Sequence, residues 1–425
     1  MRRVSIIGFG KIGQALAAQI LRRGIDVTAV DTDPALPLLF SQSNFHSSEP
    51  GVEEVLLQSY VSGKLQVTGN FNEVEGCDAI IISIPLLVGS NHKPATQEFS
   101  DCLRKLAPHC KNRLPIIIET SVPIGFCRNT ALYELESAQK RHGVDFLLAH
   151  SPERIKSGTM LHQLSQIPKV IGGIDEEAGL AAAAVYAQFI EPGLLHRVKN
   201  TEAAELVKMA GMIYRDVNIA LSNQLAQLAN ALQIDMAGLI PLVNTDKEAN
   251  LLQPGIGVGG HCTPVYPWFL IDNFERAGLD FTLARQGRTI NDGMAPYAIS
   301  LAGATRNKKA LILGLAFRPN VKEDAMSTTY LLSRELNKQG YEVFVHDTEF
   351  SDAEITARGL TPVTGIYHTD ASIVFLVTMH HQYRDIDFRR LAQSGVEVVV
   401  DGRNAFDAGK IKEAGMRYAG IGKSV

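Results

Sequence analysis

Cys262 is the residue of this 425-residue chain whose type and surroundings most favour covalent chemistry. It ends a loop, Pro254–Cys262, that holds four glycines within six residues and is therefore expected to be neither helix nor strand. Glycines allow a ligand to approach the backbone closely, and a thiol placed there could attack an aldehyde and form a thiohemiacetal. Most free cysteines are instead small, buried and inert residues, so the spacing alone leaves both interpretations open.

A glycine pattern near the N-terminus predicts a dinucleotide site. Gly8, Gly10 and Gly13 follow a short β-branched run and precede a segment with an Ala/Leu/Ile face, as a strand, a tight turn and a helix require. The helix N-terminus would direct its free N–H groups and its dipole at a pyrophosphate. Asp31, 18 residues after Gly13, ends the next strand, where a carboxylate can accept the ribose hydroxyls of NAD and repel the 2′-phosphate of NADP. The residues expected to bind the cofactor are Gly8, Phe9, Gly10, Lys11, Ile12, Gly13 and Asp31.

Three further segments place carboxylates and a lysine where ligands commonly bind. Glu119 opens the segment Glu119–Gly125, directly after an apolar strand, and Glu153 lies in Ser151–Arg154 after another. The carboxyl ends of parallel strands line the crevice in which α/β proteins bind ligands. Lys208 lies in an apolar context three residues after a glutamate on a predicted helix. Each also has a structural interpretation, as a loop salt bridge or a solvated ion pair on a helix surface.

The elements that must position these residues alternate between strands and helices. Short apolar runs without polar alternation are typical of parallel strands buried on both faces. A first series lies at 79–83, 114–118, 146–149 and 170–173, and a second at 310–315, 341–346, 373–377 and 396–400. Between the two series, residues 201–231 predict one helix of about 45 Å, which suits a connector between domains or a dimer seam.

The pattern predicts an α/β fold with two Rossmann-like doubly wound parallel-sheet domains joined by a long central helix. We expect residues 1–200 to form the NAD-binding domain and residues 201–300 to form a central helical region that carries the cysteine loop. Residues 301–425 are expected to form the second Rossmann-like domain.

Composition excludes several classes of protein. The 41 basic and 45 acidic side chains give a net charge of −4, which argues against nucleic-acid and polybasic membrane-surface binding. The five cysteines are odd in number and widely spaced, so neither a disulfide framework nor a metal site is expected. No apolar stretch approaches the roughly 20 residues of a membrane span, and the apolar run after Arg3 is too short for a signal peptide. We therefore expect a cytoplasmic protein that does not bind membranes.

Seven segments, taken in order, resemble the UDP-glucose/GDP-mannose dehydrogenase family over nearly the whole chain. They are the glycine turn at 8–13, ETSVPIG at 119–125, SPER at 151–154, ELVK at 205–208, GVGGHC at 257–262, GLAFRPN at 314–320 and VVVDGRN at 398–404. The last three are specific to the family. Gly158 after SPER, YRDVNIA at 214–220 and Val265 resemble the UDP-N-acetylmannosamine dehydrogenase branch in particular.

The resemblance implies that the C6 alcohol of a nucleotide sugar of the UDP-HexNAc type is oxidised to a carboxylate while two NAD are reduced in succession. It assigns Cys262 as the nucleophile that carries the thiohemiacetal and the thioester, and Lys208 as the cation that stabilises the developing oxyanion. Glu153 would act as general base, directly or through water, and Ser121 would hold a catalytic water. The remaining assignments are Pro85 and Glu119 to the cofactor, and Met212, Gly259, Gly260, Tyr266, Phe317 and Arg318 to the substrate.

The resemblance further implies a homodimer formed through the central helix, and a C-terminal domain that binds the nucleotide of the substrate. It also implies a place in polysaccharide biosynthesis. These are expectations about partners that the residues themselves do not specify.

Four positions depart from the family pattern. Met212 stands one helical turn after Lys208, where the family has an asparagine, and Tyr266 stands where it has an aspartate. Ala325 replaces the arginine that reaches the substrate of the partner subunit, and 85–87 reads Pro-Leu-Leu in place of Pro-Thr-Pro. Losing an oxyanion donor typically costs about 10²–10³ in rate, and losing an arginine–anion contact costs about 1.5–3 kcal/mol.

Because the nucleophile, the lysine and the glycine turn remain, we interpret the chain as a working enzyme with a remodelled substrate pocket. Two other interpretations stay open. The same enzyme class could act on another alcohol such as a nucleoside, or stop at the aldehyde. A non-catalytic protein that binds NAD or a nucleotide is the third interpretation.

Overall fold

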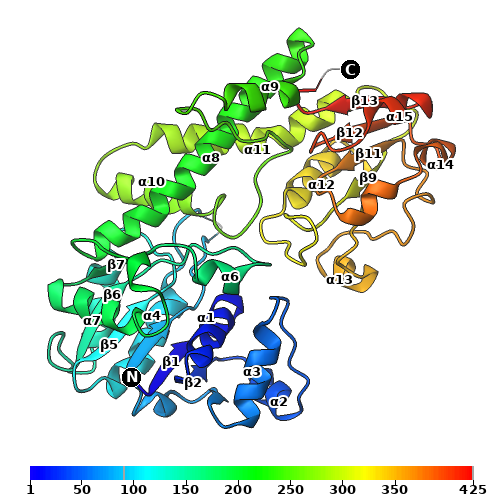
Figure 1. Cartoon of the computed structure of the whole chain (residues 1–425). Coiled ribbons are helices and arrows are strands. Elements are labelled where there is room, and N and C mark those ends of the chain that lie inside the picture. The colour runs from blue at the N-terminus through cyan, green and yellow to red at the C-terminus, as the bar shows by residue number, and fades with distance from the viewer. Residues whose placement is uncertain (90, 424–425) are drawn as a thin grey trace. The chain divides into compact units, whose positions relative to one another are not determined.

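The computed structural model describes residues 1–89 and 91–423, which divide into two compact units. Unit 1 comprises Met1–Gly211 and Trp268–Ala277, and unit 2 comprises Met212–Pro267 and Gly278–Val425. Helices α8 (Thr201–Leu232) and α10 (Tyr266–Arg276) each contribute residues to both units (Figure 1). The boundaries expected after residues 200 and 300 stay predictions.

Unit 1 is built on a sheet of eight strands, β1 (Arg3–Ile7), β2 (Asp26–Val30), β3 (Leu65–Thr68), β4 (Ala79–Ile82), β5 (Leu114–Ile118), β6 (Phe146–His150), β7 (Lys169–Gly173) and β8 (Leu195–Arg197). Their order is β3-β2-β1-β4-β5-β6-β7-β8, and the pairings among the first six are parallel. The order 3-2-1-4-5-6 is that of a dinucleotide-binding Rossmann sheet, in which ligands bind where the order reverses between β1 and β4.

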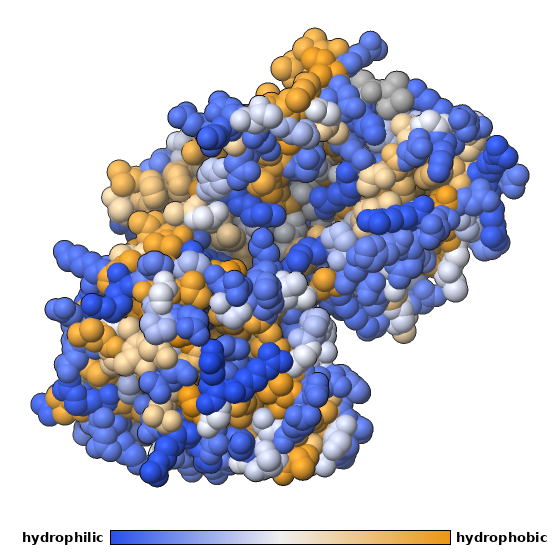
Figure 2. Space-filling model, viewed as in Figure 1, coloured by the Kyte–Doolittle hydropathy of each residue, from blue (hydrophilic) through white to orange (hydrophobic). Residues whose placement is uncertain are grey.

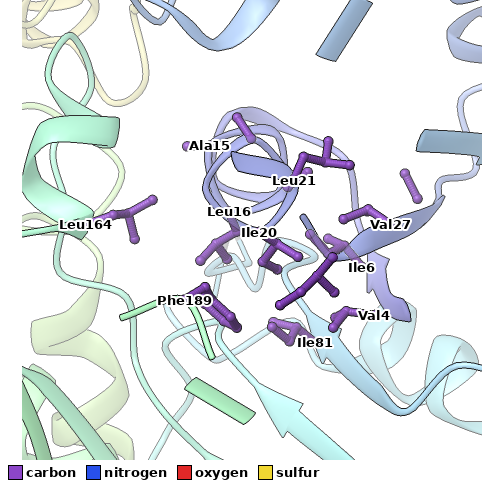
Figure 3. Packing of buried hydrophobic residues seen from close by; sticks show 14 of the residues in the cluster. Val4, Ile6, Ala15, Leu16, Ile20, Leu21, Val27, Ile81, Leu164 and Phe189 are labelled. Atoms are coloured by element: carbon purple, nitrogen blue, oxygen red, sulfur yellow. The ribbon is translucent and has the colours of Figure 1, made fainter. Parts of the chain in front are cut away.

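Helices pack on this sheet through apolar side chains. β4 reads Ala-Ile-Ile-Ile with every residue buried, since a strand covered on both faces needs no polar alternation. Figure 3 shows Leu16 and Ile20 of α1 directed toward Ile6 and Ile81 of the sheet. The helices of unit 1, besides its parts of α8 and α10, are α1 (Lys11–Arg22), α2 (Ala35–Ser41), α3 (Val52–Val61), α4 (Gln97–Leu106), α5 (Leu132–Glu136), α6 (Met160–Leu164) and α7 (Glu176–Tyr186).

β7 differs from the parallel strand that its apolar run predicts, because it pairs antiparallel with β6. The antiparallel direction brings Lys169, at the start of β7, to Glu119 and Glu153, which compensate its buried charge. In the observed register His150 faces Gly172, so continuing it places Lys169 opposite Glu153, at the carboxyl edge of the parallel strands.

Unit 2 is built on a parallel sheet of β9 (Lys309–Leu313), β10 (Glu342–His346), β11 (Ile373–Leu376), β12 (Val398–Asp401) and β13 (Arg417–Gly420). Its order, β10-β9-β11-β12-β13, is a second doubly wound arrangement, with its reversal between β9 and β11. The helices wholly in unit 2 are α9 (Met236–Val243), α11 (Thr282–Ala302), α12 (Thr328–Lys338), α13 (Asp352–Ala357), α14 (Phe388–Gln393) and α15 (Ala408–Glu413).

The predicted fold class is confirmed, including the long central helix. Helix α8 has 32 residues and a length of about 48 Å, and it starts at the predicted Thr201. Among the described residues, no helix combines the length and the apolar character needed to cross a membrane.

Leu16 offers a test of the packing in unit 1. Its side chain is fully buried between α1 and the sheet, so Leu16→Ala should lower the free energy of unfolding by about 2–5 kcal/mol through lost burial and the cavity left behind. Leu38→Ala, the same substitution on the exposed face of α2, should change it by less than about 0.5 kcal/mol. Denaturant unfolding followed by the fluorescence of Trp268, the single tryptophan, reports on unit 1. Equal losses in both variants would contradict this assignment of the core.

Candidate functional site

The turn between β1 and α1 has a backbone that glycine alone allows. Gly8 has a φ of +90°, and a Cβ built there would lie 2.8 Å from the backbone nitrogen of Ile84. A Cβ on Gly13 would lie 2.1 Å from the carbonyl oxygen of Gly8. These two glycines therefore let α1 begin directly against the strand, at the reversal point of the sheet.

Gly10 leaves space where a dinucleotide phosphate would bind. It occupies the N-cap position of α1 with an ordinary φ of −69°, and a Cβ built on it would meet none of the described residues within 4 Å. The Asp31 carboxylate at the tip of β2 accepts the backbone N–H of Phe9 at 2.6 Å and that of Asp33 at 2.9 Å, which fixes it beside the turn. An open helix N-terminus beside a fixed acid is the arrangement that NAD requires.

The segments that follow β4, β5 and β6 lie side by side at one edge of the sheet. The backbone N–H of Glu119 donates to the carbonyl of Ile82 at 2.8 Å, and that of Glu153 donates to the carbonyl of Glu119 at 3.1 Å. Since Gly8 approaches the backbone at Ile84, the glycine turn borders the same edge. The predicted residues brought to this edge are Pro85, which is exposed, and Glu119, Ser121 and Glu153, which are buried.

Glu119 and Glu153 share a buried lysine. The Lys169 ammonium donates to Oε2 of Glu153 at 2.6 Å and also to Oε1 of Glu119, and the Tyr186 hydroxyl donates to Oε2 of Glu119. Burial raises the pKa of Glu119 to about 8, despite the neighbouring cation. Burial would also raise the pKa of Glu153, but the Lys169 charge and hydrogen bonds to its carboxylate lower it to about 2. Burial therefore favours the protonated form of Glu119, whereas the contacts of Glu153 favour its ionised form.

The two ionisable residues of the ELVK segment have separate partners. Lys208 is buried, and its Nζ donates to the carbonyl oxygen of Glu153 at 2.7 Å, which places it at the edge described above. Glu205 is fully buried and accepts the backbone N–H groups of Gly125 at 2.6 Å and Cys127 at 3.0 Å. Glu205 thus caps the start of the helical turns after ETSVPIG, as an anion at a helix N-terminus does.

Cys262 differs from the other four cysteines in its surroundings. It is half-buried in unit 2, at the end of the glycine loop, and α10 begins after it at Tyr266. Desolvation by burial raises the pKa of Cys102 and of Cys110 to about 12, and it raises the pKa values of Cys77 and Cys127 as well. Those four thiols are therefore poor sources of thiolate.

The glycines before Cys262 fit closely against the C-terminal part of unit 2. A Cβ on Gly259 would lie 2.8 Å from the Cβ of Phe317, and one on Gly260, whose φ is +111°, would lie 3.0 Å from the Phe317 ring. The backbone N–H of Gly260 donates to the carbonyl oxygen of Ala325 at 2.8 Å. Ala325 therefore contacts the cysteine loop through its main-chain carbonyl. This hydrogen bond does not use the side chain of residue 325.

Three other predicted substrate residues, Tyr266, Met212 and Arg318, also belong to unit 2. Tyr266 begins α10, and its backbone N–H donates to the carbonyl oxygen of Cys262 at 2.9 Å. Met212 is half-buried on α8, and Arg318 is half-buried directly after Phe317. Their roles toward a substrate stay predictions.

A buried polar chain that the sequence patterns did not single out supports the cysteine loop. The Asp216 carboxylate, on α8, accepts Arg288 Nη1 and Asn291 Nδ2, each at 2.8 Å. Asn291 accepts Asn223 Nδ2 at 2.9 Å, and Asn223 in turn accepts the backbone N–H of Gly255 at 2.9 Å. The signal was present, because Asp216 and Asn223 interrupt a helix face that is otherwise apolar.

The sequence patterns also gave no indication that Lys169 and Tyr186 belong to the candidate site. The available signal is a charged residue directly before the apolar run Val170–Gly173, a position that is costly to bury without a partner. Because the partners come from strands about 16 and 50 residues earlier in the chain, the pattern alone could not identify them.

Comparison with known proteins gives a consistent result. Models of the UDP-glucose/GDP-mannose dehydrogenase family match three stretches, the NAD binding domain at residues 2–190, the central domain at 202–293 and the UDP binding domain at 311–408. The UDP-N-acetyl-D-mannosamine dehydrogenase of Pyrococcus horikoshii is 28% identical over 99% of each chain. The NDP-N-acetyl-D-galactosaminuronic acid dehydrogenase of Ralstonia nicotianae is 28% identical over 96% of this chain and 97% of its own. A solved UDP-D-ManNAc dehydrogenase structure from Pyrococcus horikoshii has a TM-score of 0.90 at 27% identity and covers 99% of each chain.

Gly10 provides a test of the cofactor site. Because a methyl group there meets space rather than protein, Gly10→Ala should fold normally but weaken NAD binding at least about tenfold by filling the phosphate position. Gly193→Ala is the matched control, since a Cβ there also meets none of the described residues within 4 Å, and it should leave NAD affinity unchanged. Calorimetric titration with NAD measures both, and wild-type affinity in Gly10→Ala would place the phosphates elsewhere.

Proposed function

Because the chain belongs to the UDP-glucose/GDP-mannose dehydrogenase family, we propose that it oxidises the C6 primary alcohol of a nucleotide sugar to a carboxylate, with NAD accepting both hydrides. The observation that carries this proposal is Cys262, a half-buried thiol in a loop of glycines, in a chain that also has an NAD-binding turn. UDP-linked N-acetylhexosamines are the first substrates to test, because the relatives compared above are named for sugars of this kind.

The proposed chemistry balances as two hydride transfers and one hydrolysis. The alcohol loses a hydride to NAD and a proton to a base, which gives the aldehyde. The Cys262 thiol adds to the aldehyde, and the thiohemiacetal loses a second hydride to NAD and a second proton, which gives a thioester. Water then cleaves the thioester and restores the thiol, so one alcohol, two NAD and one water become one carboxylate, two NADH and three protons.

The residues of unit 1 supply charge stabilisation and proton handling in this proposal. Lys208 stabilises the oxyanion that develops on the substrate, which a cation does well when it is shielded from water. Ser121 holds a water, and Glu153 accepts a proton, directly or through that water. Pro85 and Glu119 lie at the edge of the sheet where the cofactor is proposed to bind. Glu119 is buried there and accepts hydrogen bonds from Lys169 and Tyr186.

A second candidate, oxidation that stops at the aldehyde or that uses another alcohol, is favoured by Met212 and Tyr266. A methionine offers no donor to an oxyanion, and a phenol replaces the carboxylate that the family resemblance leads us to expect beside the cysteine. Ala325 likewise supplies no charge to an anionic substrate. The number of NADH formed for each product distinguishes this candidate from complete oxidation.

We further propose that the chain forms a homodimer through α8. Tyr214, Leu221 and Leu228 are half-exposed at intervals of seven residues, so they lie along one face of the helix. Leu232 and Leu242 extend the exposed apolar surface toward α9, where Figure 2 shows hydrophobic residues gathered. Surface of this kind on a helix of about 48 Å suits a second copy of the same helix. The cytoplasmic location and the role in polysaccharide biosynthesis stay predictions.

Cys262→Ser tests the covalent step. We expect acid formation to fall by about 10³-fold or more, because an alcohol side chain is a far weaker nucleophile than a thiol, while aldehyde and at most one NADH still form. Cys102→Ser, at the other half-buried cysteine, should retain full acid yield. Product analysis by mass spectrometry with UDP-N-acetyl-D-mannosamine and NAD measures both, and full acid yield from Cys262→Ser would remove the thioester from the pathway.

Substitutions on α8 test the dimer. The double variant Leu221→Glu/Leu228→Glu puts four carboxylates into the proposed dimer interface and should weaken dimerisation at least about 100-fold. Leu180→Glu, at an exposed leucine on α7, should leave the mass unchanged. Light scattering over a concentration series measures the mass, and a wild-type monomer, or a dimer that survives the double variant, contradicts this interface.

A further inference from the structure

The buried cluster of Lys169, Glu119, Glu153 and Tyr186 holds more negative than positive charge if both carboxyls are ionised. The side chains of Lys169, Glu119 and Glu153 are at least nine-tenths buried, and Tyr186 is fully buried. Two carboxylates that share one ammonium away from water disfavour each other's ionisation, which favours a proton on one of them. Both carboxyls accept from the same Lys169 ammonium, which holds them close together.

Three other groups around the cluster bear on where its proton lies. His150, which precedes the SPER segment on β6, is fully buried, and burial lowers its pKa to about 3, so its ring is neutral. Lys208 on α8 is a second buried lysine beside the cluster, and its Nζ donates to the main-chain carbonyl of Glu153 at 2.7 Å. Tyr186 on α7 keeps its proton, because burial beside Glu119 raises its pKa well above the ordinary value. The proton of the cluster therefore belongs to the carboxyl pair.

Glu153 is poorly suited to keep a proton that it receives. Its Oε1 already accepts the backbone N–H groups of Arg154 at 2.5 Å and Ile155 at 2.8 Å, and its Oε2 accepts Lys169. These contacts all favour the ionised carboxylate. Glu119, in contrast, accepts side-chain donors only from Lys169 and Tyr186 among the described residues.

We propose that Lys169 is a positioning residue that joins Glu153 and Glu119 into one proton-accepting unit, in which a proton taken up at Glu153 is stored on Glu119. When the substrate alcohol loses its hydride to NAD, its hydroxyl proton reaches Glu153. The Lys169 ammonium gives one proton to the Glu119 carboxylate and takes one from protonated Glu153. Glu153 is again a carboxylate, Lys169 is again an ammonium, Glu119 is a carboxylic acid, and no electrons move in this transfer.

This inference rests on the proposed function, and it deepens it by assigning the ionisation that limits activity. Turnover requires that Glu119 first be a carboxylate. Since burial raises its pKa to about 8, the active fraction should increase about tenfold for each pH unit below 8 and level off above it.

The pH profile of Glu119→Gln tests the role of the cluster. For wild type, kcat for NADH formation with UDP-N-acetyl-D-mannosamine should rise about tenfold per pH unit between pH 6 and 7.5. Glu119→Gln cannot take up the proton, so its profile should be flat in this range and its kcat at pH 8 about 10²-fold lower. Glu54→Gln, on the exposed surface of α3, should match wild type in both respects. A rising limb that persists in Glu119→Gln overturns the proposal.

Two variants of Lys169 separate positioning from simple structural support. Lys169→Met removes the cation, so both carboxyls hold protons more tightly and the rising limb should move to higher pH by at least one unit. Lys169→Arg keeps the cation and should return the limb toward its wild-type position. If Lys169 only supported the fold, both substitutions would change the amount of folded enzyme. The pH range over which kcat rises would then be the same as in wild type.

Unfolding of the protein without substrate gives an independent measurement. Folded Glu119 binds its proton up to about pH 8, whereas an unfolded glutamate releases it near 4.5. The folded state therefore holds the extra proton, and Glu119 makes stability fall as pH rises from about 5 to 8. Relative to Glu119→Gln, the unfolding equilibrium constant of wild type should increase up to about tenfold per pH unit in this range.

The outcomes of these experiments are distinct. If wild type oxidises no nucleotide sugar, the proposed function fails, whatever the unfolding data show. If wild type is active but the pH dependence of activity is the same with and without Glu119, the relay fails and the proposed function stands. Identical pH dependence of unfolding in wild type and Glu119→Gln would also overturn the relay, because Glu119 would then hold no proton near neutral pH.

Discussion

The ammonium group of Lys169 lies between the carboxyl groups of Glu119 and Glu153, and the unit 1 site is arranged around it. The lysine reaches both because β7 runs antiparallel to β6, which brings the start of β7 to the carboxyl edge of the parallel strands. Removing one partner from a buried ion pair typically costs about 3–5 kcal/mol, since the remaining charge is left without compensation. The turn that carries Glu153, and with it the carbonyl that holds Lys208, therefore depends on a residue outside every recognised motif.

The two units share one arrangement at the reversal points of their sheets, a glycine with positive φ followed by backbone N–H groups that an aspartate accepts. In unit 1, Gly8 has a positive φ beside β4, and Asp31 accepts a backbone N–H of the turn. In unit 2, Gly314 has a φ of +103°, and Asp347 accepts the backbone N–H groups of the next two residues at 2.6 and 2.8 Å. This second turn leads to Phe317. Phe317 lies so close to Gly259 and Gly260 that neither position has room for a side chain. Steric limits on the backbone thus explain why both motifs are rich in glycine.

Much of the fold could be predicted from local sequence. Buried parallel strands are continuous apolar runs, and α8 is a long uninterrupted helical pattern, so both are visible in a short window of sequence. The antiparallel direction of β7 was not visible, because strand pairing depends on the geometry of the connection rather than on the composition of the strand.

The same distinction applies to the candidate site. The residues at 8–13, 119–121, 151–154 and 257–262 follow or precede recognisable elements, and the edge of the sheet gathers those of unit 1. Lys169, Tyr186 and Asp216 could not be assigned, because their importance lies in partners distant in sequence and in burial. A charged residue in an apolar run shows that a partner is needed without showing which one.

The proposed function depends on a remodelled pocket that still carries a nucleotide sugar from alcohol to acid through Cys262. The most direct measurement is the number of NADH formed for each UDP-N-acetylhexosamine consumed by the wild-type enzyme, with the product identified by mass spectrometry. Complete oxidation through Cys262 should give two NADH and one carboxylate for each sugar. One NADH with an accumulating aldehyde, or no turnover on any nucleotide sugar while another alcohol is oxidised efficiently, would contradict it.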